Sequence, residues 1–149
     1  MAYNANAYRI TQTARLYTAM LCSFDRAQLL TFRYENANLP EKVKNDDLKA
    51  LLKRTHRANA RAGSSVRYIV VPEYAQSCAQ IVAYHIITDM APELCADMCS
   101  WWSAGAAAIS AVDVRQRETL PRFMFDPSSV RKGHRFYTTS RNISRELSA

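Results

Sequence analysis

The stretch VRYIVVPEY at residues 66–74 is followed, after a short loop, by QIVAYHII at residues 80–87. Both runs are rich in β-branched residues, which predicts two β-strands. Pro72 has no N–H to donate, so the ladder of the first strand is expected to end there. The short loop predicts that the strands pair as an antiparallel hairpin. Glu73 and His85 stand at the ends of these apolar runs, where they indicate either a metal site or ordinary hydrogen bonding.

A further strand is predicted ahead of the hairpin, over residues 27–34. Its side chains alternate, and Leu30, Phe32 and Tyr34 share the side that we expect to be buried. The segment from Thr13 fits a helix or a strand, because its apolar residues match both periods. The Asn-rich and Ala-rich residues 1–12 are expected to form a loose N-terminal arm.

A helix is predicted between this strand and the hairpin, with Asn45 or Asp46 as its N-cap and an end at residues 63–65. Its apolar positions repeat at i, i+3, i+4 and i+7: Leu48, Leu51, Leu52 and Thr55. Basic residues at i+4 spacing follow its outer face: Lys53, Arg57 and Arg61. Such a row is either a solvated helix face or a surface for a polyanion.

Two more elements are predicted after the hairpin. Pro92 opens a short helix that runs through Trp102 and is closed by Gly105, and residues 106–112 form a strand of small side chains. The order strand, helix, strand, strand, helix, strand predicts an α+β fold. It is typical of the ferredoxin-like, split β-α-β fold, an antiparallel sheet with helices packed on one face. A basic C-terminal tail is expected at residues 127–149.

The composition predicts a single domain over residues 1–149. A chain of 149 residues with 48% hydrophobic content is long enough for one core and too short to divide comfortably into two. Lys and Arg number 20 against 13 Asp and Glu, which gives a formal net charge of +7. This surplus favours polyanionic partners such as nucleic acid or an acidic protein surface.

The cysteines and the apolar runs indicate the cellular setting. Cys22, Cys78, Cys95 and Cys99 have neither CxxC spacing nor a histidine at a zinc-finger distance, which argues against structural zinc. The first residues lack the basic and apolar regions of a signal peptide, so we expect a cytoplasmic protein with free thiols. The apolar runs fall short of the roughly 20 residues that cross a bilayer, so no membrane partner is expected.

Five stretches, taken in order, are similar to the motifs of one family. LLTFRY at residues 29–34 is similar to its first strand, and YIVVPE at residues 68–73 to its glutamate-bearing strand. AYH at residues 83–85 aligns with its His-x-His pair, and WSAGAAAI at residues 102–109 with the tryptophan and glycine before its fourth strand. HRFYTTSRNI at residues 134–143 is similar to its closing signature. In these respects the chain resembles the His-hydrophobic-His replication-initiator endonucleases, the rolling-circle Rep proteins of phages and plasmids.

The resemblance implies a nickase in which two histidines and an acidic or amide side chain hold a divalent cation while a tyrosine attacks phosphorus. Glu73 and His85 match two of the metal ligands, but Ala83 stands where the first histidine is expected. Thr119 stands at the position of the tyrosine. We therefore expect a degenerate member with no catalytic residue and no cofactor, in which Glu73 and His85 are a vestigial metal site. Mg²⁺ or Mn²⁺ is expected only if the residual site is active.

Nucleic-acid binding is the part of the implied function that these losses leave in place. One basic surface is predicted from the first strand, the helix row and the tail: Arg33, Lys53, Arg57, Arg61, Arg135 and Arg141. Tyr34 and Tyr137 are predicted to stack on unpaired bases. Lys and Arg at such positions contact phosphates, so binding to DNA or RNA should weaken with salt.

Three functions remain open. The first is a catalytically inactive nucleic-acid-binding protein in a host bacterial cell, repurposed as a regulator or as an inhibitor of host nucleic-acid machinery such as an anti-CRISPR. The second is an active rolling-circle replication nickase with an atypical site. Its metal ligands and nucleophile would come from Glu73, His85, Asp89, His134, Tyr74, Tyr84 and Tyr137. The third is an interaction protein whose basic face binds a nucleic-acid-handling protein complex.

Overall fold

The computed structural model describes residues 27–62, 67–75, 80–112 and 138–139. In chain order they form β1 (Gln28–Arg33), α2 (Glu41–Ala62), β2 (Tyr68–Tyr74), β3 (Ile81–Thr88), α3 (Pro92–Trp101), β4 (Ala107–Ala111) and β5 (Thr138–Thr139). The predicted order of strands and helices is present from β1 to β4. The short strand β5 was not predicted, and it lies within the expected basic tail.

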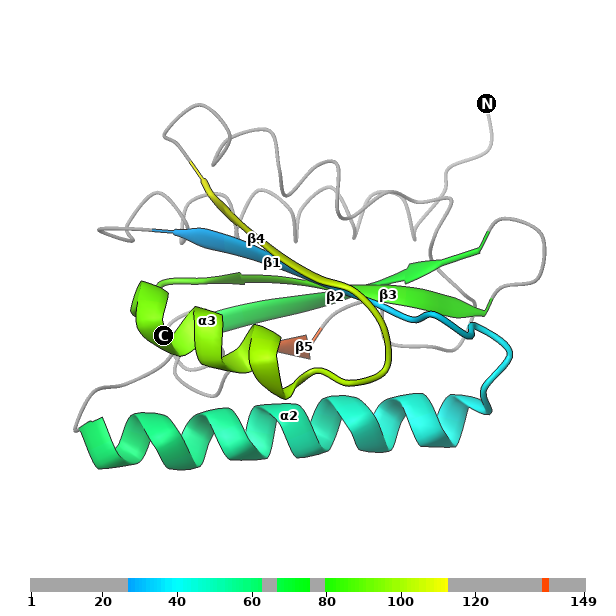
Figure 1. Cartoon of the computed structure of the whole chain (residues 1–149), viewed down its shortest axis with the longest axis horizontal. Helices are drawn as coiled ribbons and strands as arrows, with labels where there is room; N and C mark the ends of the chain where they lie inside the picture. The colour runs from blue at the N-terminus through cyan, green and yellow to red at the C-terminus, as the bar shows by residue number, and fades with distance from the viewer. Residues whose placement is uncertain (1–26, 63–66, 76–79, 113–137, 140–149) are drawn as a thin grey trace, which may run out of the picture.

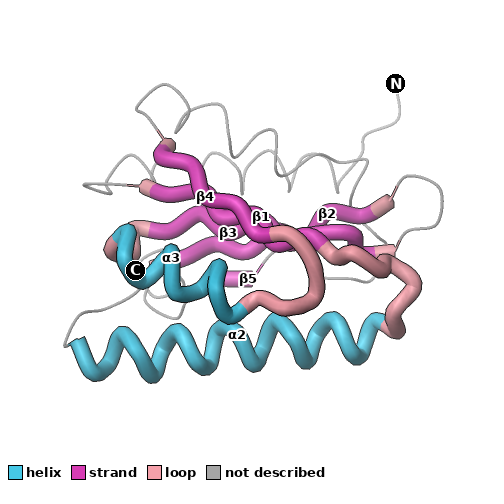
Figure 2. Tube along the Cα trace, in the orientation of Figure 1, coloured by secondary structure: helices cyan, strands magenta, loops and turns pink. Residues whose placement is uncertain are grey.

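The strands belong to one antiparallel sheet with the order β4-β1-β3-β2-β5. The connection through α2 carries the chain from β1 past the position of β3 to β2, and the connection through α3 carries it from β3 past β1 to β4. This is the ferredoxin-like arrangement. Figures 1 and 2 show α2 and α3 on the same side of the sheet. The predicted α+β fold is therefore confirmed.

The central strand β3 determines which side chains face the helices. Ile86 lies opposite Leu30 on β1 and opposite Val70 on β2. Successive side chains of a strand point to opposite faces, so the even-numbered residues of these strands point toward α2 and α3. Leu30, Phe32 and Ile86 are fully buried there, in one apolar cluster with side chains of both helices.

Helix α2 begins at Glu41, earlier than the predicted caps at Asn45 and Asp46. The Lys44 N–H donates to the Pro40 carbonyl at 3.2 Å, so the first turn already follows Pro40. The prediction was wrong because it followed the apolar repeat, and this first turn contains no apolar side chain that is buried. Neither described helix has the length and hydropathy needed to span a membrane.

A buried lysine holds the first turn of α2 instead. Lys44 is 1% exposed, and its Nζ donates to the carbonyls of Ala37 and Ile81 at 2.6 and 2.7 Å. The same Nζ lies 5.5 Å from the centre of the Tyr34 ring. A buried charge is tolerated when such groups surround it. Lys44 therefore links α2 to the start of β3.

Strand β2 continues through Pro72 to Tyr74, although the ladder was predicted to end at Pro72. On its outer side β2 pairs with β5 at Ile69 and Val70 alone. At Pro72 the strand therefore has one neighbour among the described strands, and an edge of this kind tolerates a residue without an N–H. As a consequence Glu73 lies within the sheet, opposite β3.

The end of α3 is fastened to β1 by Trp102. The helix ends at Trp101, and Trp102 has an extended backbone, whereas the helix was predicted to run on through it. The Trp102 Nε1 donates to the Arg33 carbonyl at 3.3 Å. Its ring centre lies 5.4 Å from that of Phe32 and 5.0 Å from that of Tyr34. Within α3 itself, Cys95 and Cys99 are free thiols.

Gly105 lies where the loop before β4 passes directly over β1. A Cβ atom at this position would overlap the Arg33 carbonyl oxygen and lie 2.6 Å from the Glu35 nitrogen. Hydrogen bonds on both sides fix this crossing: Arg33 N–H donates to Ala106 at 2.8 Å, and Glu35 N–H donates to Ala104 at 3.0 Å. The obstacles are backbone atoms, so only glycine fits.

We expect Gly105→Ala to lower the free energy of unfolding by about 2–3 kcal/mol, because overpacking against backbone cannot be relieved by rotating a side chain. Chemical denaturation followed by circular dichroism measures this change. The control is Ser103→Ala, at an exposed position of the same loop, which should change the free energy by less than about 0.5 kcal/mol. Equal stability of Gly105→Ala and the parent chain would contradict the prediction.

Candidate functional site

The face of the sheet away from α2 and α3, called the far face below, carries the odd-numbered residues of β1, β2 and β3. The strand register aligns these residues in rows. In one row Ala83 lies opposite Arg33 on one side and opposite Glu73 on the other. In the next row His85 lies opposite Thr31. Residues from three separate strands therefore meet at this place.

Four of these side chains form a continuous chain of contacts, the far-face network. His85 Nδ1 lies 3.2 Å from Thr31 Oγ1, and His85 Nε2 lies 2.9 Å from Glu73 Oε1. The other carboxylate oxygen, Glu73 Oε2, accepts from Arg33 Nη1 at 3.0 Å. The network thus runs Thr31, His85, Glu73, Arg33 across β1, β3 and β2.

The far-face network is satisfied with a neutral imidazole. An ionised carboxylate only accepts hydrogen bonds, so His85 Nε2 carries the proton that it donates to Glu73. His85 Nδ1 is then free to accept from the Thr31 hydroxyl. Both ring nitrogens are engaged in this way, and the tautomer follows from the partners.

The carboxyl group of Glu73 is kept ionised by its neighbours. Burial raises its pKa, but hydrogen bonds from His85 and Arg33, together with the guanidinium charge, outweigh this effect and hold the pKa below its usual value. Its side chain is 39% exposed and that of Arg33 is 49% exposed, so water screens the pair. The contribution to stability is present above the usual carboxyl pKa and is lost as the pH falls through the lowered value.

These residues do not fit a divalent cation. The two atoms that would bind it, Glu73 Oε1 and His85 Nε2, are hydrogen-bonded to each other. The third member of the row is the methyl group of Ala83, which is fully buried. Among the residues that the structure describes, no three His, Cys, Asp or Glu side chains form a group that could hold a metal ion. The positive charge beside Glu73 is instead the Arg33 guanidinium.

The other predicted metal ligands do not complete the site. Asp89 follows the opposite end of β3, where its Oδ2 pairs with Arg67 Nε at 2.8 Å. It lies four residues beyond His85, roughly 13 Å along an extended chain. The prediction that Asp89 joins Glu73 and His85 is therefore wrong. His134 lies outside the described residues.

The described tyrosines offer no nucleophile at the far face. Tyr84 is 2% exposed and points into the core, and burial raises the pKa of its phenol. Tyr74 packs against the same core cluster. Thr119 and Tyr137, the remaining positions considered from the sequence, lie outside the described residues.

The predicted basic surface is divided by the sheet. Arg33 lies on the far face, whereas Lys53 and Arg57 are exposed on α2, which covers the opposite face. The backbone of Arg61 belongs to α2, but its side chain is not among those described. Arg135 and Arg141 also lie outside the described residues.

Tyr34 does not belong to this surface, although it was predicted to stack on bases. It is 6% exposed, and its hydroxyl donates to Asp47 Oδ2 at 3.1 Å. Its ring packs edge to face against Tyr84 and Trp102. The prediction was wrong because Tyr34 continues the even-numbered, inward-facing series of β1, and its hydroxyl finds a partner inside.

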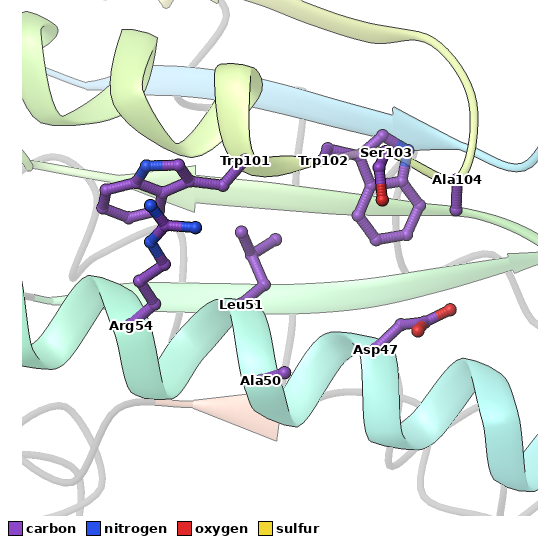
Figure 3. Close-up of a pocket in the computed structure, with 8 residues that line it drawn as sticks. All are labelled: Asp47, Ala50, Leu51, Arg54, Trp101, Trp102, Ser103 and Ala104. Carbon is purple, nitrogen blue, oxygen red and sulfur yellow. The ribbon is translucent and has the colours of Figure 1, made fainter.

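A pocket between α2 and the end of α3 was missed entirely (Figure 3). It encloses about 190 Å³. It is lined by Asp47, Ala50, Leu51, Arg54, Trp101, Trp102, Ser103 and Ala104. The residues from α2 have the spacing of a single helix face, which the sequence does show. Their partners come from a segment about 50 residues later, and no local pattern identifies such a pairing.

Comparison with known proteins gives a match over residues 27–120 to the family model for replication-associated proteins of the ORF2 type. The match begins at β1 and includes both crossover helices, the hairpin and β4. A search of curated proteins and a search of solved structures each return no match. The family match covers more than half of the 149 residues. The chain belongs to this family of replication-associated proteins.

Proposed function

We propose that the protein is a replication initiator of the His-hydrophobic-His type that has lost strand cleavage and acts by binding nucleic acid. The observation that carries the proposal is the far-face network. Where the resemblance implies a metal ion between two histidines and an acid, this chain has an arginine–glutamate–histidine chain closed by hydrogen bonds. Family membership supports the replication-related part of the proposal.

The charges of the far face support the absence of a catalytic metal. A cation that activates a phosphodiester must be held by several ligands and left with an open position. Here Glu73 is already paired with Arg33, so a divalent ion would meet a fixed positive charge and only one further ligand. The methyl group of Ala83 offers no lone pair to compensate.

The basic part of α2 supports binding without cleavage. From Leu48 to Ala62 the helix contains basic residues and no acidic ones. Lys53 and Arg57 are both exposed there, one turn apart. Cations near a helix C-terminus also complement its dipole, which is the structural explanation for such a row. The salt dependence of binding separates the two explanations.

Binding without cleavage indicates a role by occupation of a site. Such a protein either regulates replication or transcription of a mobile element, or blocks a host nucleic-acid machine in the manner of an anti-CRISPR. The partner in the first case is DNA or RNA. In the second it includes the host protein complex that handles the nucleic acid.

Incubation of the protein with labelled single-stranded DNA and Mn²⁺ tests the loss of cleavage. We expect neither nicked product nor a protein–DNA band that survives denaturant, because the far face lacks a third metal ligand and a described nucleophile. A denaturant-resistant band would establish a covalent adduct and therefore the alternative, an active nickase with an atypical site. Mapping the linked residue would then identify the nucleophile.

Restoring the missing ligand tests the interpretation of the far-face network. We expect the double variant Arg33→Gln, Ala83→His to bind Mn²⁺ at least about tenfold more tightly than the parent chain, because it gains a ligand and loses the competing cation. Isothermal titration calorimetry measures the affinity. Ala83→His alone is the matched control, and it should bind more weakly than the double variant because Arg33 still pairs with Glu73.

Ala83 is fully buried, so circular dichroism must first show that both variants fold. The parent chain supplies a test that does not depend on them. Saturable Mn²⁺ binding by the parent chain that is lost in His85→Ala would contradict the interpretation, since the far-face network should exclude the ion.

Charge reversal on α2 tests the binding surface. We expect Lys53→Glu and Arg57→Glu each to weaken binding to single-stranded DNA and to reduce the slope of log K against log salt by about 0.7 per lost phosphate contact. Lys42→Glu is the matched control on the same helix. It is exposed and lies 11 residues from Lys53, roughly 16 Å along the axis, which exceeds the screening length of about 8–10 Å.

Fluorescence anisotropy over a series of salt concentrations gives these slopes. Equal effects of Lys42→Glu and Lys53→Glu would show that only net charge matters, and the α2 surface would then be wrong. Thermal unfolding of each variant accounts for any loss of helix stability, which should stay within about 1 kcal/mol for the reversed dipole interaction.

A further inference from the structure

We propose that the pocket between α2 and the end of α3 binds a guanine nucleotide, either free or as an unpaired residue of a single strand. The inference extends the proposed function by naming a base-binding site, although binding of a free nucleotide does not depend on it. The pocket lies on the helix side of the sheet, away from the far-face network (Figure 3). Its two ends carry opposite charges, and its middle is apolar.

The middle of the pocket suits a flat, aromatic ligand. Leu51 is buried at its floor, and the indoles of Trp101 and Trp102 stand along the side formed by the end of α3. Ala50 and Ala104 are small and leave the space open. Apolar and aromatic walls with a few polar groups are typical of pockets for small ligands. Bases gain from packing on such rings whatever their sequence.

The cationic end of the pocket is held in a fixed orientation. The Arg54 guanidinium carbon lies 4.4 Å from the centre of the Trp101 ring, in a cation–π contact. No carboxylate of the described residues forms an ion pair with Arg54. A stacked guanidinium keeps its N–H groups at the edge of the stack, where they can donate to an anion. Phosphate oxygens match this donor geometry.

The acidic end of the pocket accepts hydrogen bonds. Asp47 Oδ2 receives the Tyr34 hydroxyl, which fixes the carboxylate in place. Its other oxygen, Oδ1, has no protein donor among the described residues, and an ionised carboxylate offers about four acceptor sites. A ligand group bound here must therefore present N–H or O–H donors. Among the common bases, guanine alone presents a ring N–H and an amino group side by side on one edge.

The spacing of the two ends agrees with a nucleotide. Asp47 and Arg54 are seven residues apart on α2, roughly 10 Å along the axis. A nucleotide is comparably long from the donor edge of its base to its phosphate. The base edge then lies at Asp47, the ring packs on the apolar middle, and the phosphate lies at Arg54. Lys53 and Arg57 flank Arg54 in the sequence of α2, so a longer strand meets further cations.

Intrinsic fluorescence tests the proposal directly. The chain has two tryptophans, and both line this pocket. We expect GMP to change the fluorescence saturably, with an affinity about tenfold or more above those for AMP, CMP and UMP. Absorbance by the nucleotide is corrected against N-acetyltryptophanamide. A thymidine oligomer with one central guanine, compared with thymidine alone, tests the same site in a strand.

Variants assign the two ends of the ligand. Asp47→Asn keeps an oxygen for the Tyr34 hydroxyl but presents an amide, and it should remove the preference for GMP. Arg54→Ala should reduce the affinity for GMP to that for guanosine, which lacks the phosphate. Ala50→Phe should block binding by filling the pocket, and thermal unfolding checks that it folds. Lys42→Ala, an exposed charge in the first turns of α2, is the control and should bind GMP like the parent chain.

The outcomes separate this proposal from the proposed function. No saturable response to GMP in the parent chain, or equal affinity for all four nucleotides, overturns the guanine site. Loss of GMP binding in Ala50→Phe but not in Lys42→Ala supports it. If GMP fails to bind while single-stranded DNA binding remains sensitive to Lys53→Glu, the pocket is wrong and the α2 surface stands. A covalent adduct with DNA would refute the proposed function and leave the pocket unaffected.

Discussion

The pairing of β3 with β1 on one side and β2 on the other is the constraint on which both faces of the sheet depend. A slip of one residue would exchange the faces, so that His85 would point into the core and Tyr84 would point away from the helices. Burial of Tyr84 and Ile86 beneath α2 and α3 opposes any such slip. The hydrophobic interactions that stabilise the core therefore also place Ala83 and His85, and the far-face network needs no ion to assemble it.

Arg33 gives the far face a charge balance without a metal. A carboxylate beside a neutral histidine is costly when partly buried, and the guanidinium lowers that cost as a nearby cation does. Glu73 and His85 are thus accounted for by their hydrogen bonds alone. A resemblance at two of three ligand positions is weak evidence for a metal site when the third position and the neighbouring charge both oppose it.

The sequence predicts most of this fold, because alternation in the strands and the helical repeat around Leu51 are local signals of burial. What it misses follows from contacts between distant segments. The start of α2 depends on Lys44 reaching carbonyls at Ala37 and Ile81, and no apolar pattern marks a buried lysine. Tyr34 looked available for stacking, but its hydroxyl is satisfied inside by Asp47. The pocket at Trp101 likewise depends on how α3 meets α2.

The sheet separates the chemistry of its two sides. On the far face, the described polar side chains satisfy one another, so little donor or acceptor capacity is left for a ligand. On the helix side, Arg54 is stacked but unpaired among the described residues, and Asp47 has an oxygen to spare. Ligand binding requires groups whose hydrogen bonds are not already used within the protein. The helix side, rather than the face implied by the resemblance, is therefore where nucleic acid finds unsatisfied partners in this chain.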